Sequence, residues 1–180
     1  MVQGCGDEMA SAGGILRAMK IGIISDTHEN MPRIRQAVEL FNREQVELVL
    51  HGGDIISPIT AKEFSALNAP LIGVFGNNDG DKLLLTQRFE EIGRLHKKKY
   101  EGTWDGKKFL LIHEPDMLEA LVESGVYDVI IYGHTHRPEI TRKGPTLVIN
   151  PGEGGGWITG KCTVVLLDTE TMKAELVELN

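Results

Sequence analysis

The chain has 180 residues, 41% of them hydrophobic and 25% charged, which suits one globular domain with a single core. A formal net charge of −7 without a basic arm argues against a long nucleic acid as a partner. No apolar run approaches the roughly 18 residues that span a membrane, and two cysteines, Cys5 and Cys162, suggest no disulfide framework. We therefore expect a cytoplasmic protein that binds neither membranes nor long nucleic acids.

The first residues differ from the rest of the chain. Residues 1–18 are rich in Gly and Ala, and they lack the basic start and apolar centre of a secretory signal. Met19 then begins a regular strand pattern. We expect residues 1–18 to be a disordered leader or a start-site artefact, and residues 19–180 to form the domain.

From Met19 onward, apolar runs alternate with helical patterns. Buried strands are predicted at residues 21–24, 46–50 and 71–75. A helix is predicted after each of these strands. The first begins at Pro32, the second begins at Pro58 and runs to Ala66, and the third runs from Asp81 to Ile92. This first half is typical of successive strand–helix–strand units.

The second half has more strands. Asp105-Gly106 predicts a tight hairpin between residues 98–104 and 107–112. A short helix at 115–123 and a buried strand at 129–132 follow, then short strands at 138–142, 146–150, 162–168 and 173–179. The run Gly154–Gly156 with Trp157 is typical of a flexible loop. Together the two halves predict an α/β fold in which two sheets pack face to face with helices outside.

Polar motifs follow five of the apolar runs. They are Asp26-Thr-His28, Gly53-Asp54, Gly76-Asn77-Asn78-Asp79, His113 and Gly133-His134-Thr-His136. Side chains at the carboxyl ends of neighbouring strands converge on one crevice, where such sheets usually bind ligands. We expect these motifs to form one site.

The residue types in these motifs favour a pair of metal ions. Asp26 and His28 have the i, i+2 spacing that places side chains on one side of an extended segment. The two oxygens of the Asp54 carboxylate can bridge two ions. Mixed nitrogen and oxygen donors suit Mn, Fe, Ni, Co or Zn, among which affinity order alone does not choose. Two adjacent divalent ions offset by two aspartates leave a positive site, which attracts a small phosphate ester.

Structural roles are the alternative for some of these residues. Asn77 lies in a Gly-Asn turn, which is common without any metal, and His113 stands alone in its segment. We interpret His51 as a core histidine with satisfied hydrogen bonds. Asp79 is expected to hold the loop that carries Asn77.

The five motifs resemble those of the calcineurin-like metallophosphoesterase superfamily, and the chain resembles its small single-domain prokaryotic phosphodiesterases from about Met19 to Asn180. The resemblance implies a four-layer α/β/β/α sandwich. It also implies two divalent metal ions, Mn or Ni first, and a metal-held hydroxide as the attacking group. One ion would take Asp26, His28, Asp54 and His136, and the other would take Asp54, Asn77, His113 and His134.

The chain departs from this family pattern at one position. Relatives commonly place a His after the liganding Asn, where it protonates the leaving group, but this chain has Asn78. Losing a general acid typically costs about 10²–10⁴ in rate. We therefore expect slow hydrolysis of alkyl monoesters and faster hydrolysis of diesters with acidic leaving groups. Glu114-Pro115 also replaces a common Gly-His dipeptide.

Three functions are compatible with these observations. The first is a metal-dependent phosphodiesterase for small phosphodiesters. The second is a catalytically weak protein-interaction scaffold, because the superfamily includes a retromer subunit that resembles this fold and serves mainly as a binding surface. The third is a phosphomonoesterase or nucleotidase. The oligomeric state is left open, because an edge strand or the Trp157 loop could pair two subunits.

Overall fold

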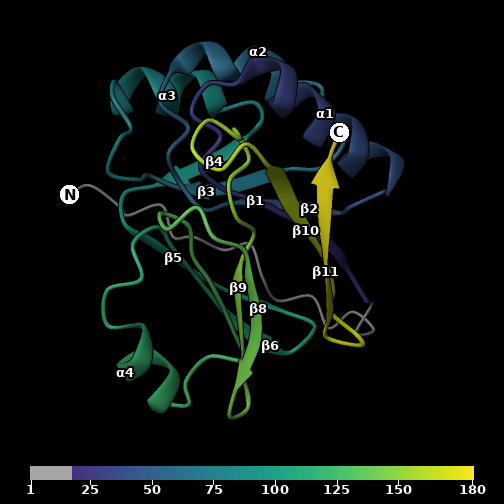
Figure 1. The fold of residues 1–180 in the computed structure, drawn as a ribbon, viewed down its shortest axis with the longest axis vertical. Coiled ribbons are helices and arrows are strands. Elements are labelled where there is room, and N and C mark those ends of the chain that lie inside the picture. Colours follow the sequence, from purple (N-terminus) through teal and green to yellow (C-terminus); the bar gives the residue numbers. More distant parts are fainter. Residues whose placement is uncertain (1–17) are drawn as a thin grey trace, which may run out of the picture.

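Two mixed sheets pack face to face in the computed structural model, which describes residues 18–180 (Figure 1). The first sheet has the strand order β11-β10-β1-β2-β3-β4 and the second has the order β5-β6-β7-β9-β8. The predicted leader lies outside the described residues except for Ala18, and it stays a prediction.

Parallel strands form the centre of both sheets. In the first sheet, β1 (Lys20–Ile24), β2 (Leu48–His51), β3 (Leu71–Val74) and β4 (Gly93–His96) are parallel, and β10 (Cys162–Asp168) and β11 (Lys173–Leu179) are antiparallel. In the second sheet, β6 (Lys107–Ile112), β7 (Val129–Ile131) and β9 (Thr146–Asn150) are parallel, with β5 (Lys99–Trp104) and β8 (Glu139–Lys143) antiparallel at the edges.

Helices flank the sheets unevenly. α1 (Met31–Arg43), α2 (Ala61–Phe64) and α3 (Lys82–Phe89) lie together over the six-stranded sheet, whereas α4 (Leu118–Glu123) lies at the opposite end of the molecule (Figure 1). The predicted α/β architecture of two mixed sheets flanked by helices is confirmed. Within the described residues, no helix combines the length and the apolar character needed to cross a membrane.

The core has two layers because β1 sends alternate side chains to opposite faces. Ile24 packs with Phe41 of α1 under the helices, whereas Ile21 and Ile23 pack between the sheets. Gly22 permits the close approach of α1, since a Cβ there would lie 2.7 Å from the Phe41 ring. The central strand therefore fixes both layers in relation to each other.

Several element boundaries differ from the sequence predictions. The helix expected to reach Ile92 ends at Phe89, and the following segment forms the parallel strand β4. The segment opened by Pro58 forms a 3₁₀ turn, Pro58–Thr60, and a single α-helical turn. The predicted helix from residue 115 begins only at Leu118, because Met117 has a left-handed backbone with φ of 61°.

The hairpin prediction is confirmed. Asp105 and Gly106 connect β5 to β6 with φ angles of 50° and 70°, the two positive values of a type I′ turn.

The strand register places the carboxyl ends of β1, β2 and β3 at the same edge of their sheet, with Ile24 beside His51 and His51 beside Gly73. The loops after these strands, and those after β6 and β7, carry the polar motifs.

Candidate metal centre

The structure brings together all seven residues that the sequence predicts as donors. The backbones of the first two motifs are joined directly, since the Asp26 N–H donates to the Gly53 carbonyl at 2.9 Å and the His28 N–H donates to the Asp54 carbonyl at 3.1 Å. These bonds hold the loops after β1 and β2 side by side, with the Asp26 and Asp54 side chains 0% and 1% exposed.

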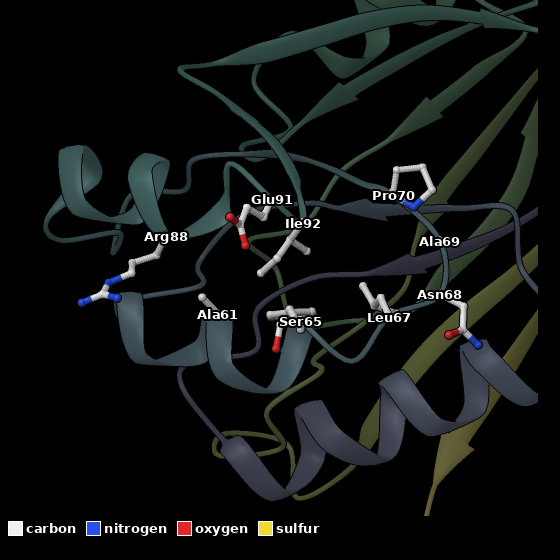
Figure 2. A pocket seen from close by; sticks show the side chains of 10 residues that line it. Ala61, Ser65, Leu67, Asn68, Ala69, Pro70, Arg88, Glu91 and Ile92 are labelled. Carbon is white, nitrogen blue, oxygen red and sulfur yellow. The ribbon is translucent and has the colours of Figure 1, made fainter.

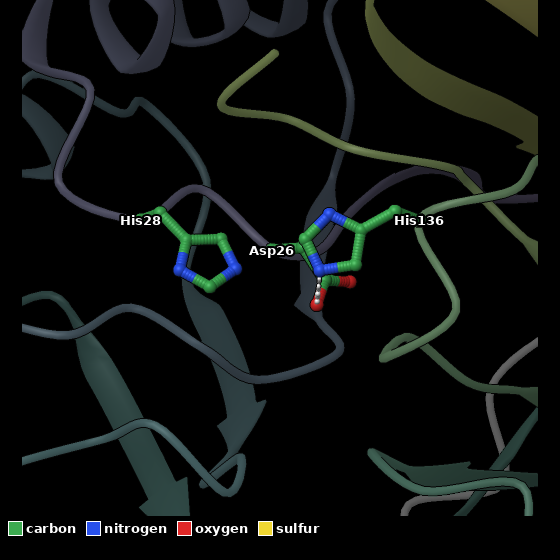
Figure 3. A group of neighbouring side chains, drawn as sticks. All are labelled: Asp26, His28 and His136. Carbon is green, nitrogen blue, oxygen red and sulfur yellow. Dashed lines mark ion pairs between the residues drawn. The ribbon is translucent and has the colours of Figure 1, made fainter. Parts of the chain in front are cut away.

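Asp26, His28 and His136 form the first donor group (Figure 3). One ligand atom of each lies within 4.8 Å of the others. His136 Nε2 lies 3.5 Å from Asp26 Oδ1, and the His28 and His136 rings stack with centroids 5.1 Å apart. His28 Nε2 also lies 3.6 Å from Asp54 Oδ2, so this group extends to the second aspartate.

The second donor group surrounds the side-chain oxygen of Asn77. His113 Nε2 and His134 Nδ1 each lie 2.9 Å from Asn77 Oδ1, and His113 Nε2 lies 3.5 Å from Asp54 Oδ1. The other ring nitrogen of His113 donates to the Gly52 carbonyl at 2.7 Å. This bond fixes the tautomer in which Nε2 carries the lone pair that a metal ligand needs.

The donor set fits divalent cations. His28 Nε2 is buried without a hydrogen-bond partner. Among residues 18–180, Asp26 and Asp54 form ion pairs with histidines only, and no Lys or Arg neutralises them. Burial is the main cause that raises the pKa of Asp26 to about 7, and the negative charge of Asp54 raises it further. A bound cation would compensate these buried carboxylates, and the mixed nitrogen and oxygen ligands suit a divalent transition metal.

Five of the seven donors have left-handed backbones. The φ angles are 53° at Asp26, 40° at His28, 57° at Asp54, 67° at His134 and 58° at His136. Such conformations cost about 1–3 kcal/mol each and persist where the surrounding structure enforces them, often at functional sites. The folded chain therefore holds these loops in shapes that isolated segments would not favour.

Two supporting residues behave as the sequence predicts. The Asp79 carboxylate accepts hydrogen bonds from the N–H groups of Asp54, Ile56 and Gly76, at 3.2, 2.6 and 2.7 Å. His51 Nδ1 accepts from the Gly53 N–H at 3.1 Å, which leaves Nε2–H to donate to Thr27 Oγ1 at 3.2 Å. His51 is thus a satisfied core histidine, and burial lowers its pKa to about 3.

Glu153 is a residue of the site that the sequence did not indicate. It follows β9 and is 1% exposed, and its Oε1 lies 3.4 Å from His136 Nδ1. The expectation of a flexible loop here is wrong, since the N–H groups of Gly154 and Gly155 donate to the Ser25 and Asp26 carbonyls at 2.8 and 2.9 Å. The one available signal was its position, since it also follows the end of a parallel strand.

A separate cavity of about 410 Å³ lies between α2, the segment that follows it and the end of α3 (Figure 2). It is lined by residues between Ala61 and Pro70 and between Arg88 and Ile92, including Phe64 and Leu67. None of the seven donors lines it. The chemistry expected from the sequence therefore belongs to the loops at the strand ends.

Comparison with known proteins agrees with this geometry. Residues 19–172 match the model of the calcineurin-like phosphoesterase superfamily domain. The chain belongs to this superfamily. The predictions of the family and of a phosphoester-hydrolysing enzyme are confirmed. The family implies divalent metal ions.

Relatives of this phosphoesterase chain cover most of its length. A phosphodiesterase of Methanocaldococcus jannaschii is 45% identical over 156 residues, which are 84% of this chain and 94% of the relative. The solved structure of an archaeal phosphodiesterase has a TM-score of 0.85 and 43% identity, and it covers 89% of this chain and 100% of its own. A zinc-complexed Vps29 of Entamoeba histolytica shares the fold alone, at a TM-score of 0.61 and 18% identity over 90% of this chain and 100% of its own.

Proposed function

We propose that the protein is a metal-dependent phosphodiesterase that hydrolyses small phosphodiesters at a dinuclear metal centre. The observation that carries this proposal is the position of Asp54 between the two donor groups. Its Oδ2 faces His28 Nε2 at 3.6 Å and its Oδ1 faces His113 Nε2 at 3.5 Å. One carboxylate with an oxygen toward each group is suited to hold two cations at once.

The donors divide into two sets that share Asp54. One cation would be held by Asp26, His28, Asp54 and His136, and the other by Asp54, Asn77, His113 and His134. Two bound divalent cations would activate water near neutral pH and offset negative charge on the phosphate. Manganese or nickel is our first expectation, and iron, cobalt or zinc also suits these ligands.

Asn78 favours diesters with acidic leaving groups. Its side-chain amide contacts Asp54, and an amide has no proton to give to a departing alkoxide at neutral pH. A leaving group that departs as a stable anion needs no such proton. Aryl phosphodiesters are therefore the expected model substrates, and a relative named as a phosphodiesterase supports phosphodiesters in general as the substrate class.

The proposal also covers the size of the substrate, the extent of the domain and its location in the cell. A net charge of −7 disfavours long polyanions while leaving a small phosphate diester free to reach a positive metal site. We propose that residues 19–180 form the metallophosphoesterase domain, that it acts in the cytoplasm without membrane partners, and that an edge strand or the Trp157 turn serves any homo-oligomer.

The test is metal removal followed by reconstitution. Chelator-treated protein is expected to lose hydrolysis of bis(p-nitrophenyl) phosphate and to regain it with Mn²⁺ or Ni²⁺. Asp54→Asn is the matched variant, because it removes the shared carboxylate charge and should not respond to either metal. Bound metal without turnover of any diester would favour the scaffold alternative. Rapid hydrolysis of alkyl monoesters would favour a phosphomonoesterase.

A further inference from the structure

We propose that Glu153 is a positioning residue that orients the His136 ring and sets its tautomer for metal binding. The proposal rests on the metal site of the proposed function, and it concerns a carboxylate outside the seven donors. Histidines that bind metals usually donate their second ring N–H to a carboxylate or a carbonyl. For His136, Glu153 is the group in that position.

The His136 ring lies between two carboxylates. Its Nε2 faces Asp26 Oδ1 at 3.5 Å, and its Nδ1 faces Glu153 Oε1 at 3.4 Å. The Nδ1 atom is buried and has no hydrogen-bond partner. A movement of about half an ångström would bring Nδ1–H into hydrogen-bond distance of Glu153. With the proton on Nδ1, the lone pair of Nε2 is directed toward the first donor group.

Glu153 is itself held in place by a tight turn. The Ile158 N–H donates to Oε1 at 2.9 Å, and the N–H and hydroxyl of Thr159 both donate to Oε2 at 2.8 Å. These hydrogen bonds fix the orientation of the carboxylate, which a group that positions a second side chain requires.

The same turn also contacts the segment that carries the other two donors of the group. The Trp157 indole N–H donates to the His28 carbonyl at 3.1 Å, and the Gly155 N–H donates to the Asp26 carbonyl at 2.9 Å. Glu153 thus lies where the backbone of Asp26 and His28 meets the side chain of His136. Removing its charge should disturb His136 before it disturbs the other donors.

The test compares wild type with Glu153→Gln and Thr159→Val, all metal-free at the start. Glu153→Gln keeps the size of the side chain and removes its charge. Thr159→Val weakens the turn while leaving the carboxylate facing His136, so it controls for loss of local structure. We would measure Mn²⁺ affinity by calorimetry, thermal unfolding, and the His136 tautomer by long-range ¹H–¹⁵N NMR.

Wild type is expected to carry its His136 proton on Nδ1. Glu153→Gln is expected to weaken Mn²⁺ binding about 10–100-fold, the usual cost of losing such a partner. Thr159→Val should lower the unfolding temperature but keep the Mn²⁺ affinity much closer to wild type than Glu153→Gln does, because the backbone N–H of residue 159 still donates to the carboxylate.

Three results would overturn the proposal. They are a wild-type proton on Nε2, an unchanged Mn²⁺ affinity in Glu153→Gln, and an equal loss of affinity in Thr159→Val. The proposed function fails differently. Wild type that binds Mn²⁺ but hydrolyses no phosphodiester would contradict that function, and a loss of affinity confined to Glu153→Gln would still support the positioning role.

Discussion

The side-chain amide of Asn78 donates a hydrogen bond to Asp54 Oδ2 at 2.7 Å, and the Asn78 backbone N–H donates to Oδ1 at 2.9 Å. Residue 78 therefore contacts both oxygens of the carboxylate that we assign to the two cations. In many members of the superfamily this position is a histidine that protonates the leaving group. Here its side chain supports Asp54 instead, which makes position 78 a direct test of the substrate class.

Asn78→His should change how the rate depends on the leaving group. Adding a general acid is expected to speed hydrolysis of esters with alkyl leaving groups by about 10²-fold or more and to affect aryl diesters little. The measurement is kcat/KM across phosphate esters of graded leaving-group acidity. Asn78→Ala is the control, because it removes the contact with Asp54 without adding an acid. An unchanged dependence in the histidine variant would show that our role for position 78 is wrong.

Gly76→Ala should destroy the metal site. A Cβ at Gly76 would overlap the Asp54 carboxylate and lie 2.6 Å from the Asp54 backbone nitrogen. We expect a loss of about 1–3 kcal/mol in the free energy of unfolding, as for other overpacked positions, together with loss of metal uptake. Gly80→Ala, four residues on, is the control, since its Cβ would meet only the Ile56 carbonyl at an ordinary 3.5 Å. Equal metal uptake by both variants would contradict the geometry.

Asp79→Ala should weaken the Asn77 loop and metal binding together. The substitution leaves the three N–H groups that Asp79 satisfies without their acceptor, at a cost of about 1–3 kcal/mol for the buried ones. The matched control is Asp81→Ala. Asp81 caps α3 by accepting from the Leu84 N–H at 2.9 Å, and losing such a cap costs about 1 kcal/mol. Urea unfolding and Mn²⁺ titration should separate the two, since only the Asp79 variant should lose affinity.

His51 should make the metal-free protein sensitive to acid. The unfolded chain binds a proton at the ordinary histidine pKa of 6.5, whereas burial lowers the pKa in the folded protein to about 3. Between these values the unfolded state binds more protons, so stability is lost as the pH falls below 6.5. At pH 5 this group alone costs about 2 kcal/mol.

His51→Gln removes this titration. The variant should be less stable at pH 7, because two hydrogen bonds change, yet it should lose about 2 kcal/mol less than wild type between pH 7 and pH 5. Urea unfolding with chelator present at both pH values measures the difference. All other titrating groups are shared by the two proteins, so parallel losses would mean that His51 is protonated in the folded state.

The sequence predicted which polar side chains lie together better than it predicted the residues that support them. Asp26, Asp54 and His134 were visible because each follows an apolar strand in a short polar motif, and parallel strands bring such ends together. Glu153 was not visible, since its importance depends on a contact with His136 and on a turn formed by residues beyond it. The left-handed backbones of the donors were also hidden, because no tight-turn signal such as Asp105-Gly106 marks them and the surrounding structure must enforce them.

The failure to predict β4 and the burial of side chains in α3 also has physical causes. β4 has the sequence Gly-Arg-Leu-His at the edge of its sheet, with none of its residues fully buried, so it lacks the apolar run of an interior strand. In α3 three apolar residues lie close together in the sequence, yet Leu84 is 37% exposed whereas Leu85 and Phe89 are buried. Near the ends of short helices, periodicity does not decide which apolar side chains face the core.

The place of β1 in its sheet has a consequence for how the enzyme is made. This strand, which leads into Asp26, is bordered by β2 on one side and by β10, more than a hundred residues later, on the other. During synthesis the β1 edge that receives β10 therefore waits until residues 162–168 have left the ribosome. The Glu153 turn immediately precedes that strand, so the turn that holds Glu153 beside His136 can form only after β10 has been synthesised.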